Sequence, residues 1–175
     1  MSRSWVNWAG NVRSTARRVA RPSSVGEVVQ EVKSAVRDGL TVKAVGSGHS
    51  FTPIAATDGV RLELSRLNGL RDFGPDSVTV DAGMPVSRLN ELLQAHGRSL
   101  TNMRDVAVQT VSGAVATGTH GTGRSSAGLA QQLRALEIVL ADGSVVTCSD
   151  NLSMSSAFVM DRLSLERQQI LHTDV

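Results

Sequence analysis

Two glycine-rich loops, each with a histidine and several hydroxyl side chains, hold the residue types that could do chemistry in this sequence. They are Gly46-Ser47-Gly48-His49-Ser50 and Gly118-Thr119-His120-Gly121-Thr122-Gly123. Glycine lets backbone N–H groups approach a phosphate closely, and Ser and Thr hydroxyls add donors without bulk. We predict that the two loops clamp a pyrophosphate between them. The alternative interpretation is two ordinary turns.

Neither loop fits the common nucleotide-binding motifs. A dinucleotide-binding fingerprint requires a third glycine at the position of Phe51, so that interpretation fails on spacing. The second loop resembles a phosphate-binding loop but has Arg124 in place of the essential lysine. Its apparent partner, Asp142, lies on a predicted hairpin turn. A nucleoside triphosphatase is therefore disfavoured.

Other chemistry-bearing residues indicate neither a metal site nor a hydrolase. His96 and His172 stand alone in the sequence, and no H-E-x-x-H pattern occurs. No G-x-S-x-G motif follows a predicted strand. The single cysteine, Cys148, excludes an internal disulfide framework and a cysteine zinc cluster. It fits a reducing compartment, so we expect a cytoplasmic protein without a bound metal.

The elements that position these loops are indicated by periodicity and capping. Ser24 and Glu27 form a capping box ahead of valines at helical spacing, and Gly39 ends the predicted helix. A strand then leads directly into the first loop. The stretch 110–126 is rich in small residues and has no helical period. The other predicted elements are strands at 40–45, 60–64 and 77–81, a helix at 85–96 and a hairpin at 133–148. This mixed order predicts an α+β domain.

The N-terminal segment 1–21 is basic, with five arginines and no acidic residue. It could be an organelle transit peptide, or a nucleic-acid-binding arm that stacks bases on Trp5 and Trp8. We favour a solvated segment held to the domain by these tryptophans, because no basic stripe occurs elsewhere. No apolar stretch approaches the roughly 20 residues of a membrane span.

Four strings in order resemble motifs of the FAD-linked oxidases of the vanillyl-alcohol-oxidase type, and most closely the sugar-lactone and alditol oxidases. The strings are Trp5 to Asn11; Gly46 to Thr52 with Asp58-Gly59; Asn102-Met103 with Gln109 to Ala114; and Thr117 to Gly123. The resemblance implies a PCMH-type FAD-binding domain over 22–150. Such a domain has two α+β lobes, here at about 22–83 and 84–150, and we expect the second to be incomplete.

The resemblance also implies roles for individual residues. His49 is similar to the histidine that bonds covalently to the flavin 8α-methyl carbon, and a neutral imidazole nitrogen suits that role as a nucleophile. The other implied FAD contacts are Gly46, Ser47, Gly48 and Ser50 at the pyrophosphate, Asp105, Thr110 and Gly113 in the second loop, and Thr119, His120 and Gly121 near the isoalloxazine ring. The implied reaction is oxidation of a CH–OH group in a sugar lactone or alditol by the flavin.

The segment 151–175 departs from the family pattern. Relatives continue through a glycine-containing segment into a substrate-binding domain, whereas this tail is polar, and we interpret 161–175 as helical. The departure predicts a truncated or frame-shifted chain in which no catalytic residue is assignable. The alternative functions are a non-catalytic flavin-binding fragment or subunit and, less favoured, a basic nucleic-acid-binding module.

Overall fold

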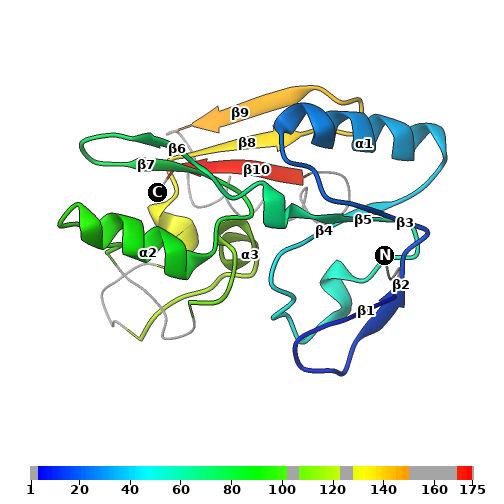
Figure 1. Cartoon of the computed structure of the whole chain (residues 1–175), viewed down its shortest axis with the longest axis horizontal. Coiled ribbons are helices and arrows are strands. Elements are labelled where there is room, and N and C mark those ends of the chain that lie inside the picture. Colours follow the sequence, from blue (N-terminus) through cyan, green and yellow to red (C-terminus); the bar gives the residue numbers. More distant parts are fainter. Residues whose placement is uncertain (1–3, 102–106, 123–127, 150–168, 175) are drawn as a thin grey trace.

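The chain folds into two lobes, each built on its own β-sheet. The computed structural model describes residues 4–101, 107–122, 128–149 and 169–174. A three-stranded sheet with α1 across one face forms the first lobe, and a five-stranded sheet with α2 and α3 beneath it forms the second (Figure 1). The predicted α+β class is confirmed.

The first lobe is a small parallel sheet. Its strands are β3 (Arg18–Ala20), β4 (Val42–Val45) and β5 (Val60–Glu63), in the order β3-β5-β4. The predicted strands at 40–45 and 60–64 match β4 and β5, whereas β3 was not predicted. Because parallel strands end at the same edge of a sheet, β4 delivers the first glycine-rich loop to one side of the lobe.

Helix α1 (Val25–Arg37) begins and ends as its sequence predicts. The Ser24 side chain caps it by accepting from the Glu27 backbone N–H at 3.2 Å. The Glu27 carboxylate reaches back one residue further than in a standard capping box, to the Ser23 N–H at 2.6 Å. After the helix, Gly39 takes φ +64°, the left-handed conformation that glycine adopts without steric cost.

The second lobe is an antiparallel sheet with two helices beneath it. Its strands follow the order β6-β7-β10-β8-β9. The bounds are β6 (Leu70–Phe73), β7 (Val78–Asp81), β8 (Ala135–Val139), β9 (Val145–Ser149), β10 (Gln169–Asp174), α2 (Val86–Ala95) and α3 (Val111–Ala116). The predicted strand at 77–81, helix at 85–96 and hairpin at 133–148 are confirmed. Strands β6 and β7 precede the lobe boundary expected near residue 83, yet they pair within the second sheet.

Helix α3 corrects the expectation that 110–126 lacks a helix. It spans only six residues, too few to show a clear period. The Thr110 side chain caps it by accepting from the Gly113 N–H at 3.3 Å. Both Val111 and Ala114 are completely buried, so the small residues that hid the helical pattern allow tight packing instead.

Strand β10 differs from the helix expected for 161–175. It pairs antiparallel with β7 and with β8, which places it in the middle of the five-stranded sheet. Its register runs from His172 opposite Asp81 to Asp174 opposite Thr79 on the β7 side. This tail segment therefore joins the two hairpins β6–β7 and β8–β9 into one sheet (Figure 1).

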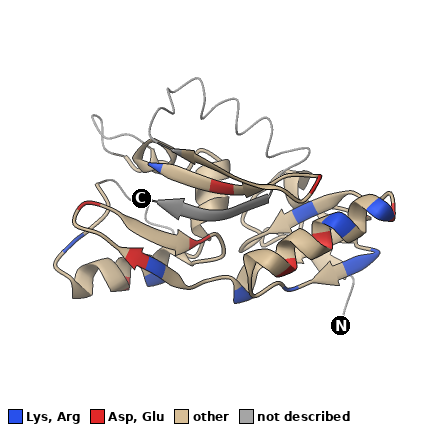
Figure 2. Ribbon diagram, turned by 90° about the horizontal axis from the view of Figure 1, so that it is seen from above, with Lys and Arg blue, Asp and Glu red and all other residues tan. Residues whose placement is uncertain are grey.

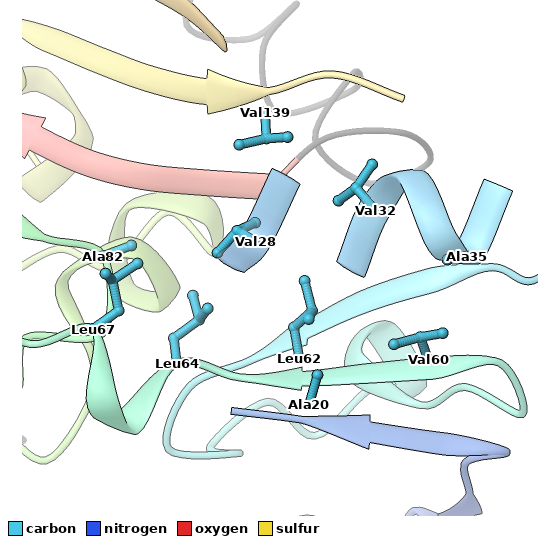
Figure 3. Close-up of a cluster of buried hydrophobic side chains, with 10 residues drawn as sticks. All are labelled: Ala20, Val28, Val32, Ala35, Val60, Leu62, Leu64, Leu67, Ala82 and Val139. Atoms are coloured by element: carbon cyan, nitrogen blue, oxygen red, sulfur yellow. The ribbon is translucent and has the colours of Figure 1, made fainter. Parts of the chain in front are cut away.

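The main core joins α1, the first sheet and part of the second lobe. Val28 and Val32 of α1 lie over Leu62, and Val139 of β8 points toward them from the opposite side (Figure 3). All four are nearly or completely inaccessible to solvent. A second core lies between β7, α2 and α3. Because Val139 belongs to the first cluster, the lobes share buried apolar surface.

Charged residues of both signs lie along α1, with acids in its first half and bases in its second (Figure 2). This order complements the helix dipole. Two N-terminal arginines are paired with acids: Arg18 with Glu31 and Asp38, and Arg21 with Glu63. None of the described helices is long and apolar enough to cross a membrane.

Candidate cofactor-binding site

A pocket lies where the carboxyl end of β4 meets the amino end of α3. Its volume is about 150 Å³, and it opens to solvent. Six residues predicted as FAD contacts line it: Gly46, Ser47, Gly48, Ser50, Thr110 and Gly113. The structure thus joins the first glycine-rich loop to the loop at Thr110, two segments that are far apart in sequence.

The first glycine-rich loop packs directly on the loop at Thr110. A β-carbon added to Gly46 would lie 2.2 Å from Thr110 Oγ1, a distance that no side chain allows. The Ser47 hydroxyl donates to the backbone carbonyl of Val108. Glycine at position 46 is therefore required by the close approach of the two loops, as well as by any ligand between them.

Backbone donors on the first loop are available to a ligand. Within the described part of the chain, the N–H groups of Ser47 to Ser50 donate no hydrogen bond. Gly48 has φ +68°, which turns this short run of N–H groups. Successive backbone N–H groups around such a left-handed residue form a concave anion site.

The amino end of α3 differs, because its own N–H groups are already engaged. Val111 N–H donates to the Met84 carbonyl at 2.8 Å, and Ser112 N–H to the Ala82 carbonyl at 3.3 Å. Gly113 N–H donates to the Thr110 hydroxyl. The loop at Thr110 therefore shapes the wall of the pocket, while the first glycine-rich loop supplies the free backbone donors.

His49 lies beside this pocket without lining it. Its imidazole stacks on the Trp8 indole, with ring centroids 4.9 Å apart and planes inclined by 19°. Both neighbours of His49 in the chain, Gly48 and Ser50, do line the pocket. The half-buried imidazole is therefore at the rim, held by an N-terminal residue.

The glycine-rich loop that begins at Gly118 is only indirectly connected to the pocket, so the described residues do not form the predicted clamp between the two glycine-rich loops. Thr119 is buried and donates through Oγ1 to Gln109 Oε1 at 3.3 Å, and Gln109 lines the pocket. His120 is exposed, with Nδ1 3.0 Å from the Gly121 carbonyl. The pocket lining includes none of Thr119, His120 and Gly121. Asp105 lies outside the described residues.

Several lining residues were not predicted as contacts. Trp5 lies against Gly48, where an added β-carbon would be 3.2 Å from its ring. Gln109 directly precedes Thr110 and begins the motif string Gln109 to Ala114, so its place in that string was the available signal. Lys43 lies on β4 just before the loop, and only its closeness in sequence to the loop pointed to it. Ser112, Ala116 and Thr117 were hidden because α3 was not predicted.

The fold and the pocket define a two-lobed flavin-binding domain, and the chain belongs to the FAD-binding domain family. The model of this family, described as "FAD binding domain", matches residues 16–149. L-gulono-1,4-lactone dehydrogenase of Mycobacterium tuberculosis is 38% identical over 152 residues, which are 86% of this chain and 36% of that protein. Alditol oxidase of a Streptomyces species is 39% identical over 150 residues, 83% of this chain and 35% of that protein.

A solved structure supports the PCMH-type fold. The crystal structure of cholesterol oxidase from B. sterolicum superposes with a TM-score of 0.81 at 19% identity, over 99% of this chain and 37% of that chain. At this identity the likeness shows the fold alone. The chain spans little more than a third of the length of these two relatives, the lactone dehydrogenase and the alditol oxidase.

FAD is the cofactor that this family implies, and the pocket fits its pyrophosphate. The unengaged N–H groups of Ser47 to Ser50 suit phosphate oxygens. No carboxylate lines the pocket among the described residues, and its one charged lining residue is the cation Lys43. A phosphate group there meets backbone donors, and none of the described lining residues carries a negative charge.

Proposed function

We propose that this chain is the FAD-binding part of an oxidoreductase that acts on CH–OH groups of sugar lactones or alditols, with the flavin attached to His49. The observation that carries the proposal is the pocket between the Gly46–Ser50 loop and the loop at Thr110. The similarity to L-gulono-1,4-lactone dehydrogenase and alditol oxidase supports the substrate class.

Each of the two loops has a separate task in this proposal. Gly46, Ser47, Gly48 and Ser50 bind the pyrophosphate through backbone N–H groups, and Lys43 adds positive charge. Thr110 and Gly113 form the opposite wall. We propose further contacts from Thr119, His120, Gly121 and Asp105, with Thr119 acting through Gln109.

His49 is the proposed attachment point because it is a nucleophile at the rim of the pocket. Its neighbours on both sides line the pocket, which supports a position beside the bound cofactor. When bound, FAD supplies the hydride acceptor for alcohol oxidation. The chain holds the cofactor and orients it. We assign no described residue to the substrate.

The first test is an absorbance spectrum of the purified protein, repeated on pellet and supernatant after acid precipitation. We expect flavin in the pellet, and its loss from the pellet in His49→Ala. His96→Ala is the matched control, because His96 is an exposed histidine that stacks on Phe73, away from the pocket. Flavin released into the supernatant would mean binding without the histidyl bond. Protein that stays colourless when offered FAD would contradict the proposal.

A turnover assay with a sugar lactone and an alditol tests the reaction. Reduction of a dye acceptor, dependent on substrate and on FAD, would support the oxidoreductase. Bound flavin without turnover would instead support the non-catalytic flavin-binding alternative. The nucleic-acid-binding alternative predicts salt-sensitive binding of DNA or RNA that weakens when Arg13 and Arg17 are changed.

A further inference from the structure

The N-terminal hairpin is hydrogen-bonded to the loop that carries His49. The hairpin consists of β1 (Ser4–Val6) and β2 (Arg13–Thr15), which pair antiparallel. The Trp8 N–H donates to the Gly48 carbonyl at 2.9 Å, and Asn7 Nδ2 donates to the Ser50 carbonyl at 2.9 Å. These bonds hold the backbone on both sides of His49.

Asn7 is the centre of the hydrogen bonds between the hairpin and the loop. Its side chain is 3% exposed and fully used: Nδ2 also donates to Asn11 Oδ1 at 2.7 Å, and Oδ1 accepts from the Val12 N–H at 3.0 Å. Asn11 in turn donates to the Phe51 carbonyl at 3.0 Å. A satisfied network of this kind, centred on a buried amide, rigidifies the segment that it joins.

The Trp8 indole takes no part in that network. It is 66% exposed, so it buries little apolar surface and contributes little to the core. Its clear contacts are the stack on the His49 imidazole and an edge contact with Phe51, at a centroid separation of 6.4 Å. The exposed indole thus acts on the one side chain in the loop that could form a covalent bond.

We propose that Trp8 is a positioning residue for covalent flavin attachment: its indole holds the His49 imidazole in the plane from which it reacts. The inference rests on the proposed attachment at His49. Restricting a nucleophile to a reactive orientation accelerates bond formation, because the entropy of orientation is lost before the reaction. Trp8 does not line the pocket, and its backbone N–H is already used by the Gly48 carbonyl.

Attachment forms one covalent bond and leaves the flavin reduced by two electrons. A nitrogen of the His49 imidazole gains a bond to the 8α-methyl carbon and loses its proton, and the methyl group loses one hydrogen. The two electrons and two hydrogens stay on the cofactor until dioxygen accepts them and leaves as hydrogen peroxide. Trp8 enters no bond in this sequence. It only limits the orientations of the imidazole.

Two substitutions of Trp8 distinguish the effect of its aromatic ring from the effect of its size. Trp8→Leu keeps apolar volume and the backbone hydrogen bonds but removes the stack, whereas Trp8→Phe keeps an aromatic plane. Apoprotein is mixed with FAD, and the flavin that remains with acid-precipitated protein is followed over time. We expect Trp8→Leu to slow attachment about three- to tenfold, the size of an aromatic stacking contact. Trp8→Phe should stay close to the wild-type rate.

A second measurement distinguishes positioning from direct flavin contact. FAD affinity is measured in His49→Ala and in the double variant with Trp8→Leu, where no attachment occurs. Equal affinities would support positioning, while an equal loss of affinity and attachment rate would overturn it. In the wild-type apoprotein, NMR should show the His49 ring protons shifted upfield by the indole ring current. Shifts typical of an unstacked histidine would also overturn the proposal.

The outcome for the wild-type protein separates this inference from the function on which it rests. Wild-type protein that retains flavin after acid, with Trp8→Leu attaching at the same rate, would overturn the role of Trp8 alone. Wild-type protein that binds FAD but never retains it after acid would overturn both the histidyl bond and the role of Trp8.

Discussion

Gly46 and Thr110 touch so closely that a single β-carbon on Gly46 would lie 2.2 Å from Thr110 Oγ1. This contact joins the loop that ends β4 to the cap of α3, and both sides of it line the pocket. Thr110 also pairs with Pro85 in an isolated antiparallel bridge. The contact between Gly46 and Thr110 therefore sets how closely the two walls of the proposed FAD site approach each other.

We expect Gly46→Ala to weaken FAD binding at least about tenfold, equivalent to about 1.4 kcal/mol, because the two loops must separate to admit the methyl group. Titration of apoprotein with FAD, followed by flavin fluorescence, measures this. Gly26→Ala is the matched control, since its added carbon would meet only Ser24 Oγ at 3.9 Å in α1. Equal FAD affinity in the two variants would contradict the contact.

Thr110→Val removes the cap of α3 while keeping the shape of the side chain. The Gly113 N–H would lose its acceptor, and loss of a helix cap costs about 1 kcal/mol. We expect the free energy of unfolding to fall by about that amount in urea denaturation. Thr110→Ser keeps a hydroxyl and should recover most of the loss. A Ser variant as unstable as the Val variant would argue against the cap.

Gly83→Ala is expected to destabilise the whole chain. The added carbon would lie 2.0 Å from the Leu64 carbonyl oxygen and 2.7 Å from that of Leu67, and backbone atoms cannot rotate away as a side chain does. We expect a loss of more than about 3 kcal/mol in thermal or urea unfolding.

Gly74→Ala provides the comparison for Gly83→Ala. Its added carbon would be 3.4 Å from the Ser77 carbonyl, an ordinary van der Waals contact. We expect its melting temperature to stay near that of the wild type. Similar melting temperatures for the two variants would show that the backbone around Gly83 can yield.

Glu27 should make stability depend on acid pH. Hydrogen bonds from the Ser23 N–H and hydroxyl lower the pKa of the Glu27 carboxyl below its ordinary value of 4.5. A lowered pKa in the folded state stabilises the fold above pH 4.5 and loses this effect as pH falls through the lower value. The difference in stability between wild type and Glu27→Gln should therefore become smaller as the pH falls from 7 to below 4.5, which unfolding curves across this range measure. A difference independent of pH would contradict this assignment.

Much of the site could be predicted from short-range patterns. The glycine-rich run at 46–50 pointed to an anion-binding loop, and six of the predicted contacts lie on one pocket. The structure adds that α3 uses its own N–H groups internally, so Thr110 and Gly113 form a wall. That distinction depends on the Met84 and Ala82 carbonyls, which no local pattern connects with α3.

Residue type and spacing were enough to predict the elements whose signals are local: the cap of α1 at Ser24, the left-handed end at Gly39 and the turn of the β8–β9 hairpin. Their hydrogen bonds close within a few residues, so residue type and spacing suffice. The tertiary structure alone decided the place of β10 between β7 and β8, the packing of Gly46 on Thr110 and the stack of His49 on Trp8. These relationships join segments far apart in the chain, and only the packing of the two lobes and the hairpin brings them into contact.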